Sequence, residues 1–118
     1  QANDQIISLA MIETEEAVTN AEEICATPGL TGIYVGPSDL AISMGEGPGL
    51  DRKPGKVYDA IQHVLKMAKK AGIRAGLHCM DPNYIKEMYA SGFEFASLSN
   101  DVRLLTQIVS SQINDVRS

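Results

Sequence analysis

The sequence repeatedly places a helix-ending glycine directly before a short apolar run, and this feature constrains the fold most. Gly32-Ile33, Gly72-Ile73 and Gly92-Phe93 each join a helix-type segment to a run typical of a β-strand. Strands that alternate with helices pair in parallel, and right-handed crossovers lay the helices on the sheet. The pattern predicts an α/β fold with four parallel βα units, either a small doubly wound sheet or half of an eightfold barrel.

The predicted elements follow from apolar periodicity and from the residues that begin and end helices. The expected strands span residues 6–12, 33–35, 73–77 and 93–98, and the expected helices span 15–25, 38–43, 57–68, 82–91 and 102–116. The first run is rich in β-branched residues, which is typical of a strand covered on both faces. Thr14 and Asp81 are the expected helix N-caps. Residues 45–55 hold four glycines and two prolines, so they form a long loop of the kind that often covers a functional site.

Composition narrows the class of protein. The net charge of −5 argues against a nucleic-acid partner, because binding phosphates requires clustered Lys and Arg. The apolar run Ile6 to Ile12 is far shorter than the ~18 residues of a membrane span. Cys25 and Cys79 lack metal-ligand spacing and nothing demands an oxidising compartment, so we expect a cytoplasmic protein. Residues 1–118 suit one domain, and a start at Gln1 instead of Met suggests a segment of something longer.

Polar residues follow the predicted strands, and in parallel α/β folds ligands gather there. Glu13 ends the first strand, where it is equally compatible with a site and with a solvated helix start. Asp39 alone is better explained as part of a turn or helix cap. Together, two carboxylates on neighbouring strand ends can hold Mg²⁺ or Mn²⁺, with water completing the shell. His78 could be a base or a ligand, although a lone histidine is more often structural, and Asp101 is the expected cap of the last helix.

Two sequence blocks carry a family resemblance. Residues 10–14 (AMIET) and residues 28–41 (PGLTGIYVGPSDLA) resemble the signature blocks of the HpcH/HpaI aldolase/citrate lyase family. The similarity continues through residues 76–79 and 92–105, so it covers essentially the whole chain. It implies the carboxyl-terminal half of a TIM-type (β/α)8 barrel of the phosphoenolpyruvate/pyruvate superfamily.

The family's chemistry is reversible aldol cleavage of 2-oxo-4-hydroxy acids to pyruvate and an aldehyde. The resemblance makes Glu13 and Asp39 ligands of a divalent cation, Mg²⁺ or Mn²⁺ with Co²⁺ as a further option. It also makes Gly36, Pro37, Ser38 and Asp39 the segment that binds a pyruvate-like 2-oxo acid. The family's catalytic Arg and His–Asp base come from the first half of the barrel, so no catalytic residue is assigned in this chain.

The chain also departs from the family pattern. Met11 stands where many members have Gln, and Ser99 stands where some have Gly. Two alternatives to an aldolase fragment therefore stay open: a non-catalytic module that binds metal and 2-oxo acid, and a lyase acting on acyl-CoA esters. A half-barrel has open edges, so we expect a homo-oligomer or pairing with a missing amino-terminal half, and family members exchange terminal helices.

Overall fold

The computed structural model describes residues 1–2 and 4–118, and its four strands form one parallel sheet. The strands lie side by side in chain order as β1 (Leu9–Ile12), β2 (Gly32–Val35), β3 (Arg74–Cys79) and β4 (Phe95–Leu98). The helices are α1 (Glu15–Thr19), α2 (Ala21–Cys25), α3 (Pro37–Ser43), α4 (Lys56–Ala71), α5 (Pro82–Ser91) and α6 (Asp101–Arg117). The prediction of four parallel βα units is confirmed. An order that never reverses is that of a barrel segment, since a doubly wound sheet reverses at its switch point.

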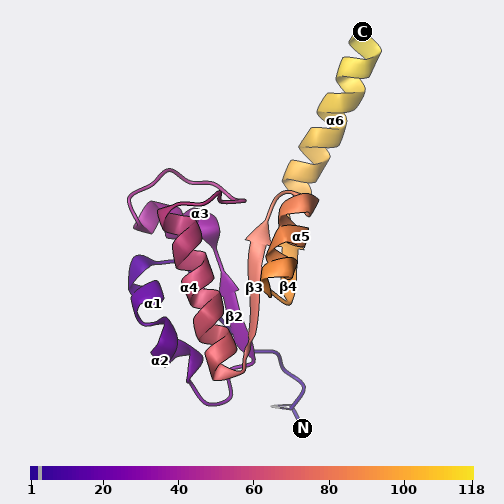
Figure 1. The fold of residues 1–118 in the computed structure, drawn as a ribbon. Coiled ribbons are helices and arrows are strands. Elements are labelled where there is room, and N and C mark those ends of the chain that lie inside the picture. The colour runs from indigo at the N-terminus through magenta and orange to yellow at the C-terminus, as the bar shows by residue number, and fades with distance from the viewer. Residues whose placement is uncertain (3) are drawn as a thin grey trace.

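Helices cover one face of this sheet, with α1, α2 and α4 gathered on the same side of β2 and β3 (Figure 1). Alternate strand residues face them, and the aligned set Ile12, Val35 and Leu77 is fully buried. Helix α4 contributes Ile61 and Val64 to the same core, and each such burial is worth about 1.5–3 kcal/mol. This apolar layer fixes the position of the strand ends.

The opposite face of the sheet is open, contrary to the prediction that the first strand is covered on both sides. Leu9 and Met11 point to this open face and are 38% and 55% exposed. Strand β1 is also shorter than predicted, because Ile6 and Ile7 lie outside it and are exposed. In a closed barrel this face would be the interior.

Local signals at most helix ends are confirmed. Thr14 caps α1 by accepting a hydrogen bond from the Ala17 N–H (3.0 Å), and Asp81 caps α5 in the same manner. Gly72 and Gly92 end α4 and α5 in the left-handed conformation that glycine adopts readily. Three predictions are wrong in detail. Gly32 does not end a helix, because α2 ends at Cys25 and Gly32 is the first residue of β2. The first helix breaks into α1 and α2, and the last is capped by Asn100, whose side chain accepts from the Arg103 N–H.

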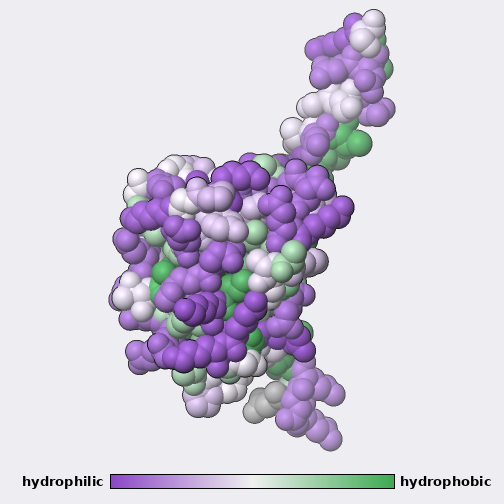
Figure 2. Space-filling view, viewed as in Figure 1, coloured by the Kyte–Doolittle hydropathy of each residue, from purple (hydrophilic) through white to green (hydrophobic). Residues whose placement is uncertain are grey.

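Helix α6 projects away from the rest of the molecule (Figure 1). No residue of α6 is buried, and its apolar side chains, among them Leu105 and Val109, are 44–88% exposed. The radius of gyration of 16.4 Å exceeds the about 13.5 Å of a compact chain of this length. Hydrophobic surface is visible where α6 leaves the body (Figure 2). Across the residues described, no helix is long and apolar enough to cross a membrane.

Candidate metal and substrate site

A cavity of about 200 Å³ lies at the carboxyl ends of β1, β2 and β3. It brings together every residue that the sequence analysis assigned to metal or substrate binding. Its lining consists of Met11, Glu13, Tyr34, Gly36, Pro37, Ser38, Asp39, Leu50 and His78. The carboxyl ends of parallel strands thus meet at one point, as the topology predicts.

Glu13 directly follows β1 and is half-buried against the start of α3. A side chain at Gly36 would place its Cβ 3.2 Å from Glu13 Oε2 and 3.3 Å from Glu13 Cβ. Glycine at position 36 therefore leaves the space that the carboxylate uses. In residues 1–2 and 4–118, neither Glu13 nor Asp39 has a Lys or Arg nitrogen within ion-pair distance. Two carboxylates that share a cavity without a counter-charge are electrostatically suited to a cation.

Asp39 is the third residue of α3 and does not cap it. Gly36 occupies the N-cap position, and α3 has no side-chain cap hydrogen bond. The alternative reading of Asp39 as a helix cap is therefore wrong. Pro37 begins the helix and is buried, while Asp39 is exposed towards the cavity that it shares with Glu13. The start of α3 thus holds the Asp39 carboxylate at the cavity.

The donor set fits a hard divalent cation. No group of three or more His, Cys, Asp or Glu side chains in the described part of the chain is arranged to hold a metal. Two carboxylates leave several positions of an octahedral shell to water and to oxygens of a ligand, which is the usual arrangement for Mg²⁺. The absence of thiolate and imidazole from the pair argues against a structural zinc site.

The loop between α3 and α4 covers part of the cavity and is anchored at two points. Ser38 Oγ accepts a hydrogen bond from the Gly49 N–H (3.2 Å). The two carboxylate oxygens of Asp51 accept from the Met80 and Asp81 N–H groups at 2.9 and 2.8 Å. Leu50 lies between these anchors and lines the cavity. The prediction of a loop over the site agrees with this arrangement.

A cluster of three polar side chains, which we call the His78 cluster, adjoins the same cavity and was not predicted. His78 Nδ1 lies 2.5 Å from Ser97 Oγ and 3.4 Å from the Tyr34 hydroxyl, and this hydroxyl also contacts Ser97 Oγ. The Tyr34 ring stacks on Phe95 with centroids 5.9 Å apart. Gly76 permits this stack, since a Cβ there would overlap the Phe95 ring. His78 thus has the partners that a structural histidine needs, and it also lines the cavity.

The two cysteines lie in the core. Cys25 and Cys79 are both buried and both are free thiols. Burial raises the pKa of Cys25, and it raises the pKa of Cys79 to about 12, with the negative charge of Asp51 adding to the shift at Cys79. Both thiols therefore stay protonated at neutral pH.

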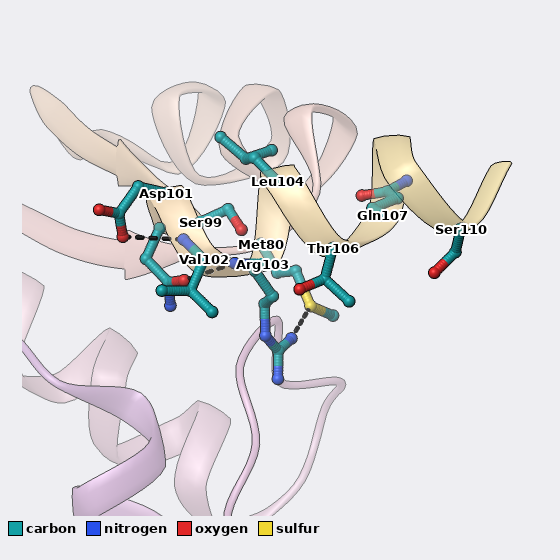
Figure 3. A pocket seen from close by; sticks show the side chains of 10 residues that line it. Met80, Ser99, Asp101, Val102, Arg103, Leu104, Thr106, Gln107 and Ser110 are labelled. Atoms are coloured by element: carbon teal, nitrogen blue, oxygen red, sulfur yellow. Dashed lines mark hydrogen bonds between the residues drawn. The ribbon is translucent and has the colours of Figure 1, made fainter. Parts of the chain in front are cut away.

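A second, wider cavity of about 690 Å³ lies at the start of α6 and shares no lining residue with the first (Figure 3). Asp101 is found here, where its carboxylate accepts from the Val102 N–H. The Arg103 guanidinium contacts the Met80 sulfur across the groove. Ser99, at its edge, has a φ of 54°, which lies in the left-handed region that favours glycine. Asp101 therefore does not join Glu13 and Asp39.

Comparisons with known proteins agree with this architecture. The family model described as HpcH/HpaI aldolase/citrate lyase matches residues 1–107. A hydroxypyruvate/pyruvate aldolase of Rhizorhabdus wittichii is 36% identical over 118 residues, which is 100% of this chain and 47% of that protein. A 4-hydroxy-2-oxo-heptane-1,7-dioate aldolase of Klebsiella pneumoniae is 33% identical over 91% of this chain and 40% of its own length.

The fold comparison gives the same proportions. A solved HpcH/HpaI aldolase/citrate lyase family protein from Burkholderia cenocepacia superposes with a TM-score of 0.90 and 33% identity. The match covers 100% of this chain and 45% of that structure. The chain therefore spans about half the length of the relatives it matches.

Proposed function

Because the chain belongs to the HpcH/HpaI aldolase/citrate lyase family, we propose that it carries the metal-binding half of a pyruvate aldolase. The reaction is the cleavage of a 2-oxo-4-hydroxy acid to pyruvate and an aldehyde, and its reverse. The observation that supports it best is that Glu13 and Asp39, which follow different strands, line one cavity with no Lys or Arg of residues 1–2 and 4–118 within ion-pair distance. The names of the Rhizorhabdus and Klebsiella relatives describe aldolases that handle pyruvate-type acids, which is consistent with this activity.

Each residue of the cavity has a distinct role in this proposal. Glu13 and Asp39 hold a divalent cation, Mg²⁺ or Mn²⁺, and Gly36 leaves room for the Glu13 carboxylate. A divalent cation held by these two carboxylates would supply Lewis-acid polarisation of the substrate's 2-oxo group. Backbone N–H groups at Ser38 and Asp39, in the first turn of α3, bind the substrate carboxylate. Leu50 and its loop limit the access of water to this end of the cavity.

Cleavage also requires a base, and the family resemblance implies that the base and the catalytic Arg belong to the first half of the barrel. This chain covers 47% of the Rhizorhabdus relative and 45% of the Burkholderia structure. We therefore assign the complete reaction to a protein in which four further βα units close the barrel. The open inner face of the sheet favours a second candidate for the isolated chain, which is binding of cation and 2-oxo acid without turnover.

Association with another polypeptide is part of the proposal. Strands β1 and β4 are the edges of the sheet, and the face that carries Met11 is uncovered. Helix α6 adds an exposed apolar stripe that includes Leu105, Val109 and Val116. Exposed edges and apolar stripes of this kind are normally covered by protein. We propose that a second copy or the other half-barrel covers them in the cytoplasm, and sedimentation equilibrium of the chain alone separates a monomer from a self-associated form.

The test of the proposed function measures binding and turnover separately. Calorimetry with Mn²⁺ and oxalate, a mimic of the enolate, is expected to show binding that Glu13→Gln and Asp39→Asn each abolish. Glu16→Gln is the matched control, because Glu16 lies in the first turn of α1 and outside the cavity. Pyruvate release from a 2-oxo-4-hydroxy acid then separates an aldolase from a binding module. Unchanged Mn²⁺ affinity in Glu13→Gln would remove the metal assignment.

A further inference from the structure

The His78 cluster consists of Tyr34, His78 and Ser97, which come from three adjacent strands and share the open face of the sheet. In the register, His78 lies opposite Ser97, and Tyr34 lies opposite Gly76, two residues before His78. All three side chains are half-buried. Neither the metal site nor the core requires hydroxyls and an imidazole at these positions, so their mutual contacts call for an explanation.

Proton positions in the cluster follow from its contacts. Both hydrogen bonds of His78 within the described chain use Nδ1, so Nε2 is the nitrogen left for a ligand. If Tyr34 donates to Ser97 and Ser97 donates to Nδ1, both hydroxyl protons have an acceptor and the ring proton lies on Nε2. In the reverse direction, His78 Nδ1–H donates to Ser97 and Ser97 donates to Tyr34. The phenol proton of Tyr34 then has no acceptor among the residues described, although a phenol is a more acidic donor than the serine hydroxyl. The first direction is therefore favoured, and it makes Nε2 an N–H donor.

The position of this donor relative to the metal site decides what it can bind. Glu13 follows β1 and Asp39 follows β2, whereas His78 is on β3, one strand further along the sheet. Under the proposed function, the chelated carboxylate and 2-oxo group of a substrate occupy the β1–β2 side of the cavity. A carbon-3 substituent directed from there along the sheet meets His78, the residue that β3 contributes to the cavity lining. A methyl group there leaves the Nε2–H without an acceptor, while a hydroxyl group provides one.

We propose that His78 is a specificity-determining residue whose Nε2–H, oriented by Ser97 and Tyr34, binds the 3-hydroxyl of a hydroxypyruvate-type substrate. The site then prefers 2-oxo acids that carry a hydroxyl on carbon 3 over pyruvate itself. This inference rests on the proposed function, because the Glu13/Asp39 cation defines how the acid is oriented. Ser97 and Tyr34 are positioning residues, since they act on the ligand only through the imidazole.

The first experiment reads the tautomer of His78 directly. Nitrogen-15 spectra of the imidazole rings resolve two histidines, and exposed His63 serves as the internal reference. The expected result is His78 as the Nε2–H tautomer, with Ser97→Ala increasing the share of the other tautomer. Observation of His78 as the Nδ1–H tautomer in the unaltered chain would overturn the inference without any variant having to fold.

The second experiment compares ligands in the presence of Mn²⁺. Calorimetry is expected to give about fivefold tighter binding of hydroxypyruvate than of pyruvate, the worth of one net hydrogen bond. His78→Phe removes the preference while oxalate binding stays unchanged, and His63→Phe keeps the preference. Equal affinities for hydroxypyruvate and pyruvate, with oxalate still bound, would overturn the inference about His78 and leave the proposed function standing. Loss of oxalate binding in the unaltered chain would instead remove the proposed function, and this inference with it.

Discussion

Replacement of Asp51 tests how the covering loop is held over the cavity. The Asp51 carboxylate accepts two backbone hydrogen bonds, from Met80 at 2.9 Å and from Asp81 at 2.8 Å. Both lie near solvent, so each is worth about 0.5–1 kcal/mol. Asp51 also has a φ of 52°, a left-handed conformation that costs alanine about 1 kcal/mol more than glycine. Aspartate already bears most of this backbone cost, so Asp51→Ala is expected to lower the free energy of unfolding by about 1–2 kcal/mol, and Asp51→Gly by only about 0–1 kcal/mol.

The measurement combines urea unfolding, followed by far-ultraviolet circular dichroism, with hydrogen exchange at individual amides. Asp51→Gly is the matched control, because it removes the same carboxylate without the backbone penalty. In both variants the amides of Met80 and Asp81 should exchange faster, because they lose the same acceptor. Unchanged exchange rates at these two amides would refute the conclusion that the Asp51 carboxylate holds the loop through them. Equal stability of the alanine and glycine variants would refute the backbone contribution.

Three further predictions concern the scaffold. Gly32→Ala should destabilise the fold severely, because its Cβ would overlap the Arg74 carbonyl oxygen, whereas Gly47→Ala, in open space, should leave the urea midpoint unchanged. Thr14→Ala should cost about 1 kcal/mol in the same titration through loss of the α1 cap. Unfolding exposes Cys79, and the pKa of its thiol falls from about 12 to the ordinary value of 9.0. Between pH 9 and 12 only the unfolded chain loses this proton, so the free energy of unfolding decreases as the pH rises. Cys79→Ala should remove up to about 1.4 kcal/mol per pH unit of that decrease between pH 9 and 12, and an identical slope in both proteins would contradict the buried thiol.

The sequence was sufficient for the features that depend on local chemistry. The helix ends at Gly72 and Gly92, the Thr14 and Asp81 caps and the carboxylates after β1 and β2 each follow from residue type and spacing. Parallel pairing then places the strand ends together, so the convergence of Glu13 and Asp39 on one cavity could be expected before the structure was known.

The features that were missed depend on contacts between distant segments. The His78 cluster joins residues that are 19 to 63 positions apart, and only the strand register brings them together. The sequence does show polar residues at alternate positions of three neighbouring strands. Which of them face one another can be recognised only when the register of the strands is known. Asp51 likewise accepts its two hydrogen bonds from residues that are 29 and 30 positions away in the sequence. The sequence could not predict that β1 is covered on one face only, because the apolar run of residues 6–12 is the same whether the barrel is complete or half is missing.

The most direct test of the metal site is the position at which Mn²⁺ binds. Paramagnetic Mn²⁺ broadens the amide signals of residues close to it, so a titration followed by two-dimensional nuclear magnetic resonance maps the site without relying on turnover. The account predicts that signals of Glu13 and of residues 36–39 disappear first, and that oxalate strengthens the effect. Broadening that instead begins at the acidic turns of α1 and α2, at Glu16 or Glu23, would contradict the assignment of Glu13 and Asp39 as the metal ligands.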